Sequence, residues 1–190
     1  RPAAQETDGG VLIRHTLPDG SINYELGLDI VGGSLVPYGR FTSLDPDNNP
    51  VEYKVGGGAP AEPVTHIWLE ESAGLVLADE WVHLAATVNP DRNRMDLYVN
   101  GRRVAYRTEM HGETGGDVRV GGELTLGGVA DAGAATSDFF AGEMDDARVW
   151  GGARSAEDIA DNYQTELPYS SIRGLPAMVG IDEALEHEHA

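Results

Sequence analysis

The sequence predicts an all-β protein, an antiparallel β-sandwich that ends in one short helix. Short stretches of alternating apolar and polar residues recur along the chain, separated by Gly, Pro and Asn turns, as in sandwiches and barrels. A hairpin pattern occupies residues 80–101, and a helix-start pattern lies at Ser155. At 190 residues the chain is long enough for one domain with a substantial core.

The first part of the chain is predicted to contain short strands separated by turns and loops. Loops are expected at residues 44–50 and 56–63, because turn-forming residues dominate both. A final pair of short strands is expected around Gly121-Gly122. The strands predicted ahead of the hairpin are residues 11–16, 22–30, 34–42 and 64–69.

The central hairpin has two alternating strands and an Asn100-Gly101 turn. Asn-Gly is the strongest short hairpin signal, because both turn residues must accept positive φ. Residues 102–108 continue the alternation as a further strand. Each strand is expected to bury one face only. The core positions predicted for the hairpin are Val82, Leu84, Ala86, Val88, Met95, Leu97 and Val99.

A closing strand and the helix are predicted within residues 139–163. Ser155 fits the N-cap and Asp158 the capping-box position that follows it. Ile159 and Tyr163 are spaced to bury on one side of the helix.

Residues 80–101 and 139–163 resemble the laminin G-like and pentraxin-like domains of the concanavalin A-like lectin and glucanase superfamily. Residues 81–87 match the family's W-x-H-[LV]-A-x-T strand, and residues 97–101 match its L-Y-V-[ND]-G hairpin. Residues 139–150 look like its closing F-x-G-x-[IM]-D-[DE]-x-R-[IV]-[WY] strand. The resemblance implies a jelly-roll sandwich with Trp81 and Trp150 in the core.

The resemblance places residues 1–167 in a laminin G-like sandwich and residues 168–190 in a C-terminal tail. Family domains open with two strands that have no match ahead of residues 11–16. Three alternatives stay open: the chain begins inside a domain, a strand comes from elsewhere, or the tail adds one at residues 172–181. The last residues, 185–190, are interpreted as a disordered end rather than a metal site.

The chain carries a formal charge of -19, from 32 acidic and 13 basic residues. Such a polyanion repels phosphates, so nucleic acid is not an expected partner. A halophilic or marine source, calcium binding and simple solubility are the alternative explanations of the charge. No apolar stretch of about 18 residues is present to span a bilayer. The first ten residues lack the order of a signal peptide, and the absence of cysteine leaves the compartment undecided.

A glycoside hydrolase is the less favoured alternative. Hydrolases of the superfamily carry E-[IL]-D-x-x-E, which sets carboxylates about 5 Å apart on one strand face. Glu143 and Asp145 begin this pattern, but Arg148 stands where the final Glu is required. Without that proton donor no catalytic residue is predicted. The alternation of apolar residues changes register at Asp145 and Asp146, which predicts a β-bulge there. The two acidic side chains are expected to accept hydrogen bonds from exposed backbone amides or to pair with Arg148.

The resemblance implies a calcium site at the loop rim, with Asp8 and Asp131 as ligands. Asp8 precedes the first predicted strand, and Asp131 follows an L-G strand end. The sequence departs from the family at both places, since Gly9 replaces an amide and the loop before Asp131 lacks further acids. Two carboxylates alone bind weakly, because calcium takes about 6 to 8 oxygens. A solvated turn is the alternative, and the rival oxygen cluster is Asp45, Asp47 and Asn49.

The resemblance therefore implies a non-catalytic binding or adhesion module, extracellular or on the cell surface, that recognises carbohydrate with calcium at its rim. A structural domain that pairs through an open sheet edge with another chain or segment is the alternative. The expected partners are a glycan or protein ligand, or another chain. Trp68 and Tyr98 are candidates for stacking on a sugar or for covering the sheet, and His83 is expected to be a cross-strand partner.

Overall fold

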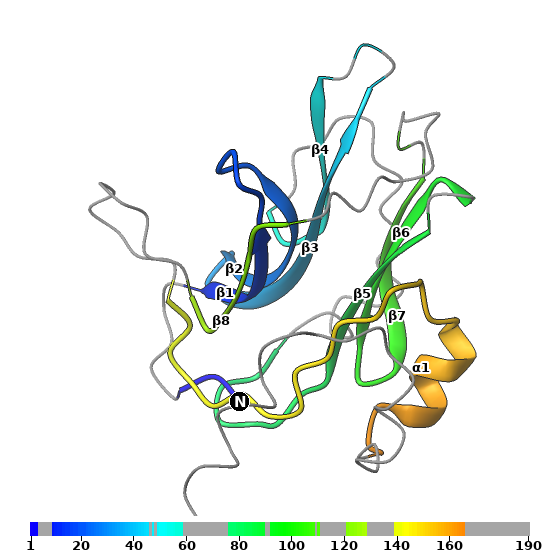
Figure 1. The fold of residues 1–190 in the computed structure, drawn as a ribbon. Helices are drawn as coiled ribbons and strands as arrows, with labels where there is room; N and C mark the ends of the chain where they lie inside the picture. The colour runs from blue at the N-terminus through cyan, green and yellow to red at the C-terminus, as the bar shows by residue number, and fades with distance from the viewer. Residues whose placement is uncertain are drawn as a thin grey trace, which may run out of the picture.

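The structure is a computed structural model that describes residues 1–3, 9–45, 47, 49–58, 76–89, 92–108, 110, 121–128 and 139–165. Two antiparallel sheets and one helix form the sandwich (Figure 1). The five-stranded sheet has the order β4-β3-β2-β1-β8, and the three-stranded sheet has the order β5-β6-β7. The elements are β1 Gly10–Thr16, β2 Ile22–Val31, β3 Ser34–Leu44, β4 Pro50–Gly56, β5 Leu84–Asn89, β6 Arg94–Val99, β7 Arg102–Thr108, β8 Glu123–Leu126 and α1 Ala156–Asn162. This architecture confirms the predicted fold class.

The main core lies where the three-stranded sheet packs on the inner faces of β3 and β4. Tyr53 and Val55 of β4 meet Met95 and Leu97 of β6, and all four side chains are at most 2% exposed. The predicted inward positions of β6 are buried, but Asp96 and Tyr98 on its other face are buried too, so the expectation that the strand buries one face only is wrong. A second cluster lies beneath β1 and β2 and contains Leu12, Leu28, Leu35 and Val76.

Strand β4 is absent from the sequence prediction, which places loops on both sides of it and no strand between them. Val51, Tyr53 and Val55 alternate toward the core, and this alternation was the available signal. Pro50 and Gly56 were assigned to the two flanking loops, and the five residues between them were left unassigned. The predicted strands 64–69 and 172–181 lie outside the described residues.

Pro37 lies inside β3, a position that an interior strand rarely allows. It is tolerated because its backbone faces the side on which β4 ends. Gly57 N donates to the Pro37 carbonyl at 3.0 Å, just beyond the last β4 residue, Gly56. The missing proline N–H therefore removes no bond from the ladder to β2, in which Pro37 lies opposite Leu28.

The hairpin turn and the helix form as predicted. Asn100 and Gly101 have φ of 48° and 75°. Ser155 caps α1, and both bonds of the capping box with Asp158 are present. A Cβ on Gly101 would lie 2.7 Å from the Tyr163 ring, so the helix end packs directly on the turn.

Two aromatic positions differ from the prediction. Trp81 is 56% exposed and Trp150 is 37% exposed, so neither is a core residue. Strand β5 begins only at Leu84, three positions after Trp81. Residues 139–150 form isolated bridges rather than a ladder, so no strand holds these rings against the core. Asp146 has a φ of 52°, but residues 143–150 form no strand, so the β-bulge predicted at the acid pair is not formed.

Truncation of Leu97 tests the core. Leu97 is 0% exposed, so Leu97→Ala should lower the free energy of unfolding by about 3 kcal/mol or more. The matched control is Leu77→Ala, because Leu77 is 56% exposed and its loss should change stability by less than about 0.5 kcal/mol. Urea denaturation measures both variants. Equal midpoints would show that Leu97 does not lie in the core.

Candidate functional site

The segment at residues 139–147 lies beside β8 and organises the candidate site. Phe140 N donates to the Gly127 carbonyl at 3.1 Å, just beyond the end of β8. Phe139 bridges Val11 in parallel, and Gly142 bridges Pro2 in antiparallel orientation. The segment is therefore attached to β1 and β8 at one end and to the first residues of the chain farther along.

Residues 1–3 pair with this segment as a strand would. Ala3 N donates to the Ala141 carbonyl and Glu143 N donates to the Arg1 carbonyl, both at 2.9 Å. The terminal ammonium of Arg1 donates to the Glu143 carbonyl at 2.7 Å. Pro2 between them is fully buried, and its carbonyl accepts Asp79 N at 2.9 Å.

This pairing places a charged pair beside an exposed ring. The Arg1 guanidinium lies 2.9 Å from a Glu143 carboxylate oxygen, and its central carbon lies 6.0 Å from the Trp81 ring centroid. Trp81, Arg1 and Glu143, here called the Trp81 platform, combine an accessible aromatic face with donors and acceptors. The available sequence signal was that Trp81 alternates with the inward position Val82, whereas the family resemblance implied that Trp81 lies in the core.

A groove of about 420 Å³ lies on the other side of the segment, between it and β8. Apolar side chains and two carboxylates share its walls. Leu126 is 55% exposed and Met144 is 37% exposed, so large apolar surfaces are accessible there. The lining residues are Leu126, Gly127, Phe140, Gly142, Met144, Asp145, Asp146 and Ala147.

The acids of the segment have structural partners. Arg148 Nε donates to Asp146 Oδ1 at 2.7 Å, and a second Arg148 nitrogen donates to the Thr165 carbonyl at 2.8 Å. Asp145 Oδ1 accepts Asp146 N at 2.8 Å. Glu143 faces Arg1, so its ion-pair partner is a base and not a second carboxylate. Among the described residues of this segment, no two carboxylates face each other as glycoside hydrolysis requires.

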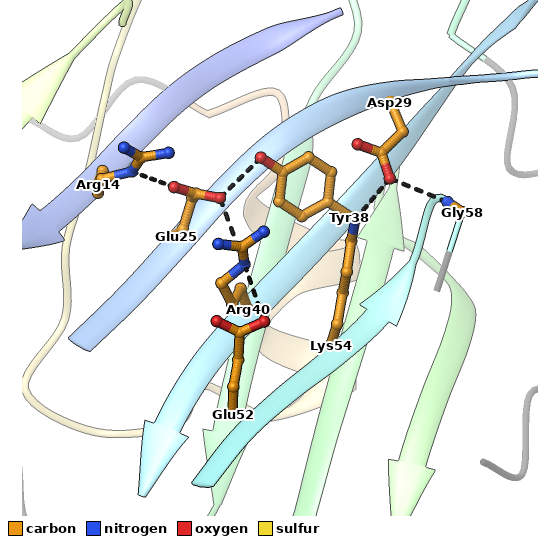
Figure 2. A network of polar contacts seen from close by, with 8 residues as sticks. All are labelled: Arg14, Glu25, Asp29, Tyr38, Arg40, Glu52, Lys54 and Gly58. Carbon is orange, nitrogen blue, oxygen red and sulfur yellow. Dashed lines mark hydrogen bonds and ion pairs between the residues drawn. The ribbon is translucent and has the colours of Figure 1, made fainter. Parts of the chain in front are cut away.

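A buried carboxylate lies on the outer face of the five-stranded sheet (Figure 2). The Glu25 side chain is 0% exposed, and an Arg14 nitrogen donates to its Oε2. The Tyr38 hydroxyl donates to Oε1 at 2.7 Å, and Arg40 Nε lies 3.6 Å from the same oxygen. Arg14, Glu25, Arg40 and Lys54 are opposite one another in register across four strands.

Asp29 continues this network toward the end of β4. Its Oδ2 accepts Lys54 Nζ at 2.6 Å and Gly58 N at 2.9 Å. Lys54 Nζ also lies 4.2 Å from the Tyr38 ring centroid. Burial, followed by the nearby Glu25 charge, raises the pKa of Tyr38, which stays a neutral donor. The network holds strands together and leaves no charge available for chemistry.

His83 and Tyr98 also have structural surroundings. His83 N donates to Asn100 Oδ1 at 2.9 Å, and the His83 ring lies 5.9 Å from the Tyr163 ring. Burial, and secondarily the Arg148 charge, lowers the pKa of His83. Tyr98 is 2% exposed and covers the sheet, so it offers no stacking surface. Trp68 lies outside the described residues.

The proposed calcium ligands Asp8 and Asp131 both lie outside the described residues. In the rival loop, Asp45 Oδ1 accepts Asp47 N at 2.9 Å and Asn49 N at 2.7 Å. These bonds, with the Asn49 backbone first, lower the pKa of Asp45. Its carboxylate therefore shapes a turn. Across the described part of the chain, no group of three or more His, Cys, Asp or Glu side chains is placed to hold a metal.

Comparison with known proteins gives one family and one solved structure. Residues 6–160 match the family model described as the concanavalin A-like lectin/glucanases superfamily. The chain is similar to the crystal structure of an S-layer domain-containing protein (residues 221–444) from Clostridium thermocellum ATCC 27405. The two are 14% identical with a TM-score of 0.34, over 84% of this chain and 64% of that chain. This chain therefore matches less than two thirds of the S-layer chain. No curated protein matches.

Glu25→Ala tests the buried network. It leaves Arg14 and Arg40 without their shared buried partner, so the free energy of unfolding should fall by about 3–5 kcal/mol. Glu52→Ala is the matched control, because Glu52 pairs with the same Arg40 but its side chain is 52% exposed. An exposed pair contributes at most about 1 kcal/mol. Denaturant titrations that give similar losses for both variants would contradict the assigned role of Glu25.

Proposed function

The chain belongs to the concanavalin A-like lectin/glucanases superfamily as a laminin G-like domain, and we propose that it binds carbohydrate outside the cell or at the cell surface. Family membership fits a non-catalytic binding module. Carbohydrate is the finer proposal, and the Trp81 platform is the observation that carries it. In the described part of the chain, no helix is long and apolar enough to cross a membrane.

The Trp81 platform offers what a sugar ring requires. A pyranose has an apolar face of C–H groups, which packs on an exposed aromatic ring, and hydroxyls at its edge that donate and accept hydrogen bonds. Trp81 is 56% exposed, with Arg1 6.0 Å from its ring centroid. Glu143, paired with Arg1 at 2.9 Å, adds an acceptor. One aromatic face, one donor and one acceptor thus lie together.

The same residues support binding without hydrolysis. Glu143 is ion-paired with an arginine, and Arg148, at the sequence position of the missing proton donor, binds Asp146. Retaining and inverting mechanisms both need two carboxylates placed across the scissile bond, and Glu143 is instead held by a base. This disfavours the glycosidase alternative.

Substitution of Trp81 tests carbohydrate binding. After a glycan array has identified a soluble oligosaccharide, calorimetry should show about tenfold or greater weakening by Trp81→Ala, because an aromatic contact contributes about 1 kcal/mol beyond its buried area. Trp150→Ala is the matched control, since Trp150 is also exposed and stacks on an arginine, Arg154, at 4.8 Å. Absence of any glycan ligand, or equal losses in the two variants, would refute the platform.

Calcium at Asp8 and Asp131 is a separate part of the proposal. A bound ion would stabilise the fold by about 2.7 kcal/mol at a hundredfold excess over its Kd, because the unfolded chain scatters the ligands. Melting temperatures should rise in millimolar calcium but not in magnesium at matched ionic strength, and Asp131→Ala should remove the difference. The ionic-strength match is needed because salt also screens the -19 charge.

Two results would remove calcium from these residues. An equal response to both ions would assign the effect to screening. A calcium response that survives Asp131→Ala but disappears in Asp45→Ala would assign it to the rival loop.

A further inference from the structure

We propose that the groove between β8 and residues 140–147 is a docking site for an extended segment of another polypeptide. The segment adds as a strand to β8, with apolar residues at alternate positions and basic residues between them. This proposal is independent of carbohydrate binding, because the two sites use different residues. Glu143 pairs with Arg1 in the Trp81 platform, whereas its neighbours Gly142 and Met144 line the groove.

The backbone of β8 offers the first reason. Among the described residues β8 pairs with β1 alone, so in this part of the chain its second edge has no strand partner and is open to an added strand. The segment that faces it meets β8 at the bond between Phe140 N and the Gly127 carbonyl. The groove therefore begins where the two segments meet, with Leu126 and Gly127 at the end of β8 on one side and residues 140–147 on the other. An added strand is the ligand that such an edge accepts.

The side chains of β8 supply the apolar part. Leu124 and Leu126 lie opposite His15 and Ile13 of β1 and share the inner face of the sheet. They are 37% and 55% exposed, and their partners Ile13 and His15 are half-buried. Met144 on the facing wall is also exposed. Exposed apolar side chains gathered at an open edge are typical of an interaction site.

The two edges of the five-stranded sheet are not equivalent. The opposite edge strand, β4, begins with Pro50 and carries the chain's single lysine, Lys54. Proline protects an edge from added strands, whereas the Lys54 side chain is held on the sheet face by Asp29. The sequence of β8, Glu-Leu-Thr-Leu, contains no proline.

The facing segment already pairs with an extended peptide on its other side. Residues 1–3 bond to it through Ala3 N to the Ala141 carbonyl and Glu143 N to the Arg1 carbonyl. Its backbone is thus held in a conformation that accepts strand-like partners.

Charge decides the class of partner. Asp145 and Asp146 line the groove, and the ion pair of Asp146 with Arg148 leaves Asp145 with no ion-pair partner among the described residues. Basic residues of a partner segment would pair there. A second copy of this chain, at -19, would instead be repelled. The chain's own residues 172–181 have the required alternation, so they are the competing occupant to be tested.

The test uses the full chain and a fluorescent peptide of about ten residues that alternates Leu or Val with Lys or Arg. A peptide of the same composition with its apolar residues clustered is the peptide control. Anisotropy should show saturable binding of the alternating peptide only. Leu126→Asp should weaken that binding about tenfold or more, while Leu77→Asp, at an equally exposed leucine outside the groove, should not. Met144→Ala supplies a second groove variant if Leu126→Asp alters the melting temperature.

Asp145→Asn should weaken binding of the basic peptide, and hydrogen exchange should show protection of residues 123–126 in the complex. Equal affinity for the two peptides, or indifference to both groove variants, would overturn the proposal. A gain in peptide affinity caused by Val179→Asp in the full chain would also overturn it. That result would mean that residues 172–181 normally occupy the groove and compete with the peptide. The proposal would also be refuted if a glycan displaced the peptide and still did so in the Trp81→Ala variant. The groove would then be a carbohydrate site.

Discussion

In the described part of the chain, the three-stranded sheet is narrower than the sheet it covers, and the candidate sites lie where it does not cover that sheet. It packs against β3 and β4, where Leu97 and Val55 are fully buried. It does not reach β8 at the far edge, where Leu126 is left accessible. The stable part of the molecule and its reactive surface are therefore at opposite edges of one sheet. The Trp81 platform and the groove both lie along residues 139–147, next to the uncovered strand.

The outer face of the five-stranded sheet is held by charge rather than by apolar packing. Glu25 accepts from β1 through Arg14 and from β3 through Tyr38, so one buried carboxylate joins three strands. Such a group is costly to bury, but once it is paired, removal of either partner leaves an uncompensated charge. The network thus favours one alignment of the strands. A fixed strand alignment also holds the backbone of the edge strand β8 in a defined geometry.

Local features were predictable from the sequence, and features that depend on the opposite layer were not. The Asn100-Gly101 turn and the Ser155 cap follow from residues a few positions apart, and both are present. Trp81 and Trp150 were wrongly assigned to the core, because burial depends on which segment covers a residue. The Glu25 network was also missed, since its members come from separate strands and meet only through register. The calcium expectation at Asp8 and Asp131 stays a prediction.

Pro37 has a consequence for how the sheet finds its alignment during folding. A slip of β4 by two residues would keep every side chain on its proper face, so the hydrophobic pattern alone would not oppose it. In one direction of slip, Val55 would lie opposite Pro37 and would need an N–H that proline lacks. That misaligned intermediate would also place Lys54 opposite Tyr38 and Glu52 opposite Arg40, in place of the native Arg40–Lys54 register. The proline within β3 thus makes that one alternative register less favourable by one ladder hydrogen bond.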